Sequence, residues 1–248
     1  MKKLFQLLRE NPSVTKAPLN VVRAENGEQS IYIYDVIDSY WGISAKDVAQ
    51  AISAMDANAT LHLRINSPGG DVFEAHAIAT AISQHAGKTI AHIDGLAASA
   101  ATFISAAADE VEISEGGFYM IHNGWTIAIG DKRAMTATAE LLDKVDASIV
   151  NVYAKRTGAE LEQIVEWMNA ETWFTAEEAV QHNFANRLAS KPEKASNATA
   201  KAFNLSAFDK APKALLQPPE PPADPNPVDA AQWRTHNERR LRLLNLNA

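Results

Sequence analysis

Segments with the twofold periodicity of a β-strand alternate with segments of helical periodicity through most of this 248-residue chain. The strand-like segments are 30–37, 60–65, 89–93, 110–113 and 118–121, and the helix-like segments are 44–55, 71–85, 99–107, 131–156, 159–168 and 175–182. A strand followed by a helix and a second strand forms a crossover unit, which joins neighbouring parallel strands. The chain is therefore predicted to fold as an α/β domain.

Glycine and proline are distributed unevenly. All 11 glycines lie between Gly27 and Gly158, whereas seven of the 11 prolines lie between Pro212 and Pro227. Pro-rich sequence without glycine favours extended backbone and is a poor core former. We therefore expect four parts: an N-terminal arm (1–18), a globular domain (19–190), a Pro-rich linker (191–227) and a short C-terminal helix or disordered tail (228–248).

Composition excludes several classes of function. With 23 Lys and Arg against 30 Asp and Glu, the net charge is -7, so no basic field is available for nucleic acid or anionic lipid. The absence of cysteine excludes disulfides, thiolate nucleophiles and Cys-ligated metals. No apolar run reaches the roughly 18 residues of a membrane span, and Gln6 and Arg9 interrupt the first one, so we expect no export signal. The expectation is a cytoplasmic protein without nucleic-acid or membrane partners.

The pentapeptide 66–70 (NSPGG) follows a strand-like segment and precedes a helix-like one. A glycine pair lets the backbone turn sharply and bring its N–H groups close to a ligand, as an oxyanion site requires. An ordinary strand-to-helix turn is an equally simple interpretation.

Ser99 lies in 95–101 (GLAASAA), which also joins a strand-like segment to a helix-like one. In the first turn of a helix, unpaired N–H groups and the helix dipole stabilise negative charge near its hydroxyl. The pattern is compatible with a nucleophile or with a simple helix cap.

A serine nucleophile needs a base that takes its proton and later returns it. Of the seven histidines, only His122 stands at the end of a strand-like segment beside a glycine turn. The other six are interpreted as surface, core-edge or tail residues: His62, His76, His85, His92, His182 and His236.

Four segments in the order INSPGG, GLAASAA, MIH and FTAEEAV resemble the ClpP family of serine peptidases, the proteolytic subunits of Clp proteases. The resemblance extends from about residue 31 to residue 188. It implies Ser99 as nucleophile, His122 as general base, and the backbone N–H groups of Gly70 and Ala100 as the oxyanion hole. It implies no metal or cofactor.

The same resemblance implies a fold and an assembly. The fold is a spiral of βαβ units shared with the crotonase superfamily, in which 131–156 is a protruding handle helix that joins rings. The expected protein is a homo-oligomeric ring that acts on protein or peptide substrates.

One position departs from the family pattern. The family usually has an aspartate before the segment that matches 174–180, whereas this chain has Glu171. A glutamate can orient and stabilise an imidazolium as an aspartate does, with one more methylene of reach. Glu171 is the expected third member of the triad, and Asp94, close to the nucleophile segment, is its rival.

The chain resembles the phage and prophage branch of the family, whose members are head maturation proteases. The resemblance lies in the glutamate, the sequence ETWFTAEEA at 171–179 and the Pro-rich tail. This resemblance implies phage scaffold and capsid proteins as partners, and a location in the host cytoplasm or within proheads. The alternatives are a housekeeping subunit served by an ATPase unfoldase, and a non-catalytic capsid assembly subunit.

Two other chemistries stay open. The segment GLAASAATFISAAADEV also resembles the signal peptide peptidase A family, which uses a Ser–Lys dyad, and Lys88 and Lys132 are the lysines near the motifs. Crotonase chemistry on an acyl-CoA uses a similar pair of N–H donors with carboxylates as acid and base.

Overall fold

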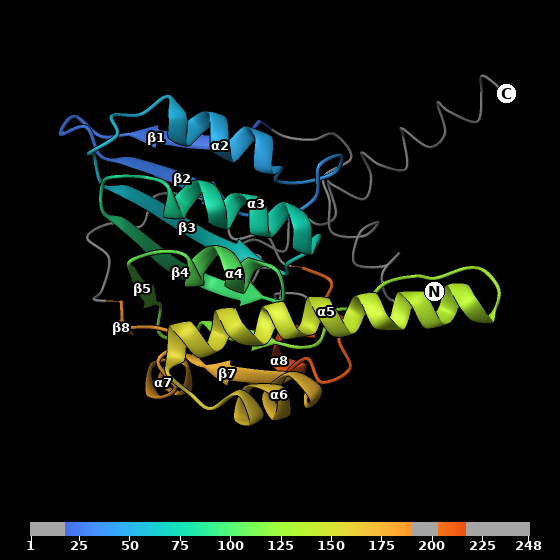
Figure 1. Cartoon of the computed structure of the whole chain (residues 1–248). Helices are drawn as coiled ribbons and strands as arrows, with labels where there is room; N and C mark the ends of the chain where they lie inside the picture. Colours follow the sequence, from blue (N-terminus) through green and yellow to red (C-terminus); the bar gives the residue numbers. More distant parts are fainter. Residues whose placement is uncertain (1–17, 190–202, 217–248) are drawn as a thin grey trace, which may run out of the picture. The chain divides into compact units, whose positions relative to one another are not determined.

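The computed structural model describes residues 18–189 and 203–216 (Figure 1). The expectations for residues 1–17, for 190–202 and for everything after 216, including the C-terminal helix or tail, lie outside this part of the chain. No helix in the described ranges is long and apolar enough to span a membrane.

One eight-stranded sheet runs through the described residues. Its strands are β1 (Asn20–Arg23), β2 (Gln29–Ile33), β3 (Leu61–Ser67), β4 (Thr89–Ala98), β5 (Glu110–Ile113), β6 (Phe118–Ile121), β7 (Thr172–Thr175) and β8 (Arg187–Leu188). The helices are α2 (Ala45–Ser53), α3 (Val72–Ser83), α4 (Ala101–Ala106), α5 (Lys132–Thr157), α6 (Leu161–Asn169), α7 (Ala176–Gln181) and α8 (Lys213–Leu216).

Strand β4 is the branch point of the sheet. The strands follow the order β1-β2-β3-β4-β5-β8, while β6 pairs with both β4 and β7. The first half of β4, Ile90–Ile93, pairs with β5, and its last residues, Leu96–Ala98, pair with β6. Strands β2 to β6 are joined by parallel pairings, and only β1 and β7 run antiparallel to their neighbours.

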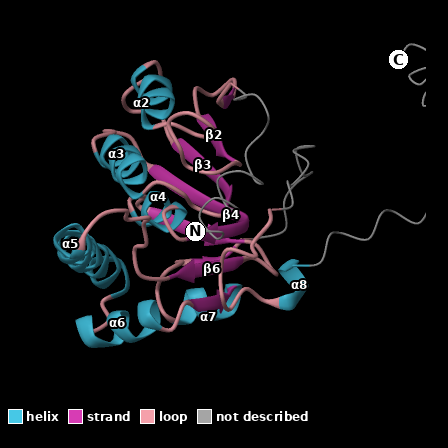
Figure 2. Cartoon of the chain, turned by 90° about the vertical axis from the view of Figure 1, so that its right-hand side faces the viewer, coloured by secondary structure: helices cyan, strands magenta, loops and turns pink. Residues whose placement is uncertain are grey.

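Helices α2, α3, α4 and α5 lie along one side of the sheet (Figure 2). Three of them begin at side-chain caps: Ser44 accepts from the N–H of Asp47, Asp71 from those of Phe73 and Glu74, and Asp131 from those of Arg133 and Ala134. Their apolar faces join the buried residues of β2, β3 and β4 in one core. Apolar burial of this kind is the main stabilising contribution to the fold.

Helix α5 is buried over only part of its length. Its buried residues, Ile149, Val150, Tyr153 and Thr157, all lie in the second half. The first half is largely exposed and runs beyond the other helices (Figure 1). The long helix predicted for 131–156 is therefore present, with Asp131 as its N-cap.

The α/β class is confirmed, and most predicted elements are present within a few residues. Three short strands, β1, β7 and β8, were not predicted, because they are defined by pairing with β2, β6 and β5 and not by a pattern in their own residues. Strand β4 continues to Ala98, five residues beyond the predicted end at Ile93. The extension, DGLAA, lacks a clear alternating pattern, and the strand conformation of its last three residues is set by pairing with β6.

Residues 203–216 differ from the extended linker expected over 191–227. Leu205, Ala207, Phe208 and Ala211 are buried against residues of β4 and β6. The apolar sequence FNLSAF at 203–208 provides this contact, and a composition argument that averages over the neighbouring prolines overlooks it.

Candidate active site

The carboxyl ends of three neighbouring parallel strands meet at one edge of the sheet. Ser67, the last residue of β3, lies opposite Ala97 of β4, and Ala98 at the end of β4 lies opposite Met120 of β6. The crevice at the carboxyl ends of parallel strands is the usual binding site of α/β folds. The three predicted motifs follow these strand ends and are therefore brought together.

Ser99 occupies a strained turn between β4 and α4. Its φ of 52° lies in the left-handed region, which is unusual for a residue other than glycine. Its N–H donates to the carbonyl of Met120 at 2.9 Å, and its carbonyl accepts from the N–H of Thr102 at 2.9 Å. Helix α4 begins at Ala101, so Ser99 precedes the helix instead of lying in its first turn as predicted.

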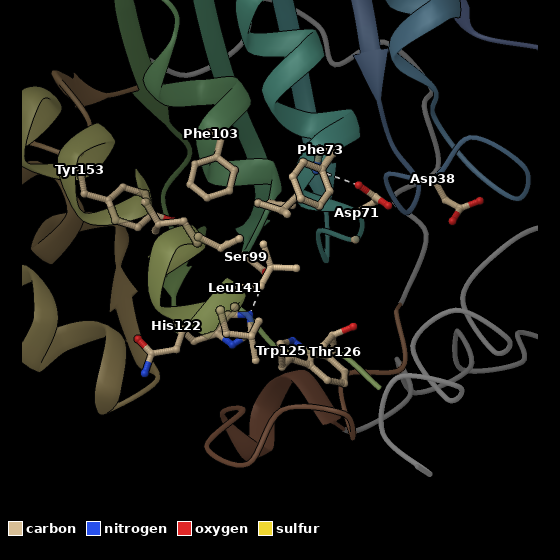
Figure 3. Close-up of a pocket in the computed structure, with 18 residues that line it drawn as sticks. Asp38, Asp71, Phe73, Ser99, Phe103, His122, Trp125, Thr126, Leu141 and Tyr153 are labelled. Atoms are coloured by element: carbon tan, nitrogen blue, oxygen red, sulfur yellow. Dashed lines mark hydrogen bonds between the residues drawn. The ribbon is translucent and has the colours of Figure 1, made fainter. Parts of the chain in front are cut away.

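The side chains of Ser99 and His122 are in direct contact (Figure 3). The Nε2 atom of His122 lies 2.7 Å from Oγ of Ser99, within hydrogen-bond distance. The loop after His122 is tied to α5, because the N–H of Gly124 donates to Oδ1 of Asp146 at 2.6 Å. These contacts fix the imidazole beside the hydroxyl.

Burial and charge act in opposite directions on His122. Burial lowers the pKa of its imidazole from 6.5 to about 4, and the negative charge of Glu171 opposes that shift by raising the pKa. At neutral pH the ring is therefore uncharged. An uncharged imidazole can accept the proton of a neighbouring hydroxyl.

Gly69 and Gly70 allow a backbone approach that no other residue could make. Their φ angles are 90° and 148°. A Cβ atom on Gly69 would lie 2.5 Å from the carbonyl oxygen of Ala98, and one on Gly70 would lie 2.1 Å from that of Ile37. The loop therefore packs directly against the turn that carries Ser99.

The N–H groups of Gly70 and Ala100 have no hydrogen-bond partner among the described residues. Both residues line the same cavity as Ser99 and His122. Ile37 forms hydrogen bonds with the residues on either side of Gly70, accepting from the N–H of Asp71 and donating to the carbonyl of Gly69. Two free donors beside a hydroxyl are the arrangement that stabilises an oxyanion.

The cavity beside Ser99 has a volume of about 240 Å³ and largely apolar walls. Its apolar lining comes from α3, α4, α5 and the loop after β6, and includes Phe73, Phe103, Trp125, Leu142, Val145 and Ile149. Figure 3 shows Phe73 and Phe103 on the side of Ser99 away from His122. A cavity with apolar walls favours binding of an apolar side chain of a ligand.

Of the two predicted acids, Glu171 lies close enough to raise the pKa of His122. No hydrogen bond joins Glu171 to His122 among the described residues. Asp94 is engaged elsewhere, since it accepts from Nε of Arg64 at 2.8 Å and from the hydroxyl of Tyr34 at 2.6 Å. Of the two carboxylates, Glu171 is therefore the one whose charge affects the pKa of His122.

The lysines considered for a Ser–Lys dyad do not line the cavity. Nζ of Lys88 lies 2.6 Å from the carboxylate of Glu110, and Lys132 is the exposed first residue of α5. Across the described ranges, no group of three or more His, Asp or Glu side chains is placed to hold a metal ion.

Residues around Glu171 were not anticipated from the sequence. The indole N–H of Trp173 and the backbone N–H groups of Asp209 and Lys210 all donate to the Glu171 carboxylate. The ring of Phe208 lies edge-on to His122, with the ring centroids 5.5 Å apart. Only the apolar sequence at 203–208 could have indicated that this region packs on the domain.

We expect His122 to titrate with a midpoint near 4 instead of 6.5, because burial disfavours the charged ring. The Glu171→Gln variant should lower the midpoint further, since it removes the charge that favours the imidazolium. NMR titration of the His122 ring measures both values, with Glu162→Gln on α6 as a control. A midpoint at or above 6.5, or one that Glu171→Gln leaves unchanged, would contradict this account.

Comparison with known proteins identifies the family. The family model described as Clp protease matches residues 18–192. The chain is 24% identical over 163 residues to the ATP-dependent Clp protease proteolytic subunit 2 of Tropheryma whipplei, covering 65% of this chain and 91% of that protein. It is 26% identical over 187 residues to the ATP-dependent Clp protease proteolytic subunit of Streptococcus gordonii, covering 69% of this chain and 95% of that protein.

A mutant form of ClpP1 from Listeria monocytogenes has a similar fold, with a TM-score of 0.58 and 22% sequence identity. The match covers 65% of this chain and 91% of that one. Because the family model spans well over half of the sequence, the chain belongs to the Clp protease family.

Proposed function

We propose that the protein is a serine endopeptidase in which Ser99 is the nucleophile, His122 the general base and Glu171 the acid. The observation that carries the proposal is the 2.7 Å contact between Oγ of Ser99 and Nε2 of His122. The free N–H groups of Gly70 and Ala100 in the same cavity support it. Membership of the Clp protease family supports peptide hydrolysis over acyl-CoA chemistry.

The proposed reaction has two stages. Oγ of Ser99 attacks the carbonyl carbon of the scissile bond while Nε2 of His122 takes the hydroxyl proton. The resulting oxyanion accepts hydrogen bonds from the N–H groups of Gly70 and Ala100. His122 then returns the proton to the leaving amine, and water hydrolyses the acyl-enzyme by the same route.

Glu171 stabilises the protonated state of His122 that forms during the reaction. Burial alone disfavours the imidazolium, and the Glu171 charge offsets part of that cost. The apolar cavity beside Ser99 would hold the side chain that precedes the scissile bond. We therefore propose peptides with an apolar residue at that position as substrates.

Labelling with a serine-directed fluorophosphonate tests the nucleophile. We expect one adduct on Ser99, located by mass spectrometry, and none in Ser99→Ala or His122→Ala. Both variants should lose about a thousandfold or more of kcat on a peptide with leucine before the scissile bond. Activity that survives His122→Ala would favour a lysine base, and an assembled protein without any adduct would favour a non-catalytic assembly subunit.

The two carboxylates provide a matched comparison within the same experiment. Glu171→Gln should lower kcat by about a hundredfold, because the imidazolium loses its counter-charge. Asp94→Asn should leave kcat within about twofold, since its partners are Arg64 and Tyr34. The opposite ranking would assign the acid to Asp94.

We also propose that the chain assembles into a homo-oligomeric ring and that the exposed half of α5 is a handle that contacts a second copy. Met135 is 40% exposed there although it is apolar. An apolar side chain on a protruding helix is better accommodated against another chain than in water. A ring would also enclose the active sites and so limit cleavage of folded proteins.

Sedimentation velocity of the full chain and of Met135→Glu tests the contact. We expect the unsubstituted chain to sediment as an oligomer and Met135→Glu to shift towards smaller species, because a buried unpaired carboxylate is unfavourable. Lys132→Glu, at the exposed start of the same helix, controls for added negative charge. A monomer at micromolar concentration would refute the ring.

For the biological role we propose head maturation, in which the enzyme cleaves scaffold or capsid precursors of a phage. Three sequence features support this role: Glu171 in the acid position, the sequence ETWFTAEEA and the Pro-rich region. The relatives named above favour a second candidate, a housekeeping subunit that works with an ATPase unfoldase, because they are named ATP-dependent.

Cleavage assays with and without ATP separate these roles. We expect the purified chain to cleave a phage scaffold precursor without ATP, and Ser99→Ala to leave it intact. Degradation of a folded, tagged protein that requires both a Clp-type ATPase and ATP, without cleavage of the precursor, would instead establish the housekeeping role.

A further inference from the structure

Residues 203–211, here called the C-terminal segment, pack beside the residues of the proposed triad. Leu205, Ala207 and Phe208 are buried against a cluster that includes Ala98 and Met120 of β4 and β6. Ala98 directly precedes Ser99, and Met120 accepts the hydrogen bond from the Ser99 N–H. The segment therefore rests on the same strand ends that carry the nucleophile and the base.

Phe208 connects the segment to the base. Its ring lies edge-on to His122, with centroids 5.5 Å apart, and edge-on to Trp173, with centroids 5.7 Å apart. Only 5% of Phe208 is exposed. Edge-to-face contacts of this kind hold the rings in a defined orientation and exclude water from one side of the imidazole.

The segment holds the acid more directly. Oε1 of Glu171 accepts from the N–H of Lys210 at 2.7 Å, and Oε2 accepts from the N–H of Asp209 at 3.0 Å. Nζ of Lys210 also donates to the carbonyl of Ala170 at 2.5 Å. Two successive backbone N–H groups thus form hydrogen bonds with both oxygens of the Glu171 carboxylate, and the indole N–H of Trp173 is a third donor.

Glu171 has two features that make such support necessary. Its φ of 48° lies in the left-handed region, so the backbone needs surrounding contacts to keep this conformation. Glutamate also has one more rotatable bond than aspartate, so more conformational entropy is lost when its carboxylate is fixed. Without outside donors, the carboxylate would sample positions away from His122.

The segment lies outside the part of the chain that the family shares. The Clp protease model matches residues 18–192, which leaves 203–211 beyond its end. The relatives in Tropheryma and Streptococcus match over 65% and 69% of this chain. The donors to Glu171 from Asp209 and Lys210 are thus an addition to the shared domain.

We propose that the C-terminal segment is a positioning element for the catalytic acid, which fixes the Glu171 carboxylate through the N–H groups of Asp209 and Lys210 and packs Phe208 against His122. This inference rests on the proposed function, because it assigns a task only if Glu171 serves His122. Active sites in general need hydrogen-bond donors behind each reacting group, which hold that group in its working orientation. The segment is then part of the active site and not a passive linker.

The Lys210→Pro substitution in the full chain removes one donor to Glu171, because proline has no N–H. We expect kcat on the leucine peptide to fall about tenfold while KM stays within about twofold, since the acid is displaced and the substrate cavity is untouched. Lys213→Pro is the matched control, because its N–H has no partner among the described residues and it lies at the first position of α8. It should leave kcat unchanged.

A double-mutant cycle separates positioning from general damage to the fold. In the Glu171→Gln background, Lys210→Pro should cause no further loss of kcat, because the group that it positions has already lost its charge. An equal loss in both backgrounds would overturn the proposal. So would a normal or raised kcat for Lys210→Pro alone, and a raised value would mark the segment as inhibitory.

Phe208→Leu provides a second variant in case Lys210→Pro fails to fold. It keeps an apolar side chain in the cluster but removes the ring edge from His122, and we expect a loss of kcat of about three- to tenfold with KM unchanged. The activity of Ser99→Ala separates failure of the proposed function from failure of the positioning role. If Ser99→Ala retains activity, the proposed function itself is wrong. If Ser99→Ala is inactive while Lys210→Pro and Phe208→Leu match the unsubstituted chain, only the positioning role is wrong.

Discussion

The close packing of the Gly69–Gly70 turn against the turn at Ser99 is the contact on which the geometry of the site depends. A Cβ atom at either glycine would overlap a carbonyl oxygen of Ala98 or Ile37, so the approach requires residues without side chains. This approach places the free N–H of Gly70 in the same cavity as the N–H of Ala100 and the Ser99 hydroxyl. The strain at Ser99 is sustained because hydrogen bonds on both sides of it hold the turn between β4 and α4.

The environment of His122 keeps its imidazole neutral at physiological pH and also provides a charge that stabilises the protonated form. Burial keeps the ring deprotonated and ready to accept a proton, while Glu171 favours the imidazolium once the proton arrives. Both effects come from long-range packing. One wall of the cavity is formed by α5, and Glu171 follows α6, so elements far apart in the chain set the environment of one imidazole.

The proposed role of residues 203–211 gives a physical meaning to the glutamate in the acid position. A longer side chain reaches further but is harder to immobilise, and here its two oxygens meet consecutive backbone N–H groups from a segment beyond the family match. Replacement of an aspartate by a glutamate and addition of a packed segment are then linked changes. Each would be less useful for catalysis without the other.

Local pattern was sufficient to predict the α/β class and most of the helices and strands, because periodicity acts over a few residues. The family resemblance was needed to single out Ser99 and His122, whose side chains lie 2.7 Å apart. The family resemblance placed Glu171 ahead of Asp94 as the expected acid, but the sequence carried no information on the partners of either carboxylate. Local pattern also placed 203–211 in a linker, because prolines nearby dominate the composition. Only the tertiary structure showed these contacts: the branching of β4 brings β6 beside Ser99, Arg64 and Tyr34 donate to Asp94, and the segment 203–211 reaches Glu171. Contacts between residues tens of positions apart depend on how strands pair and surfaces pack, and a single sequence carries no local signal for them.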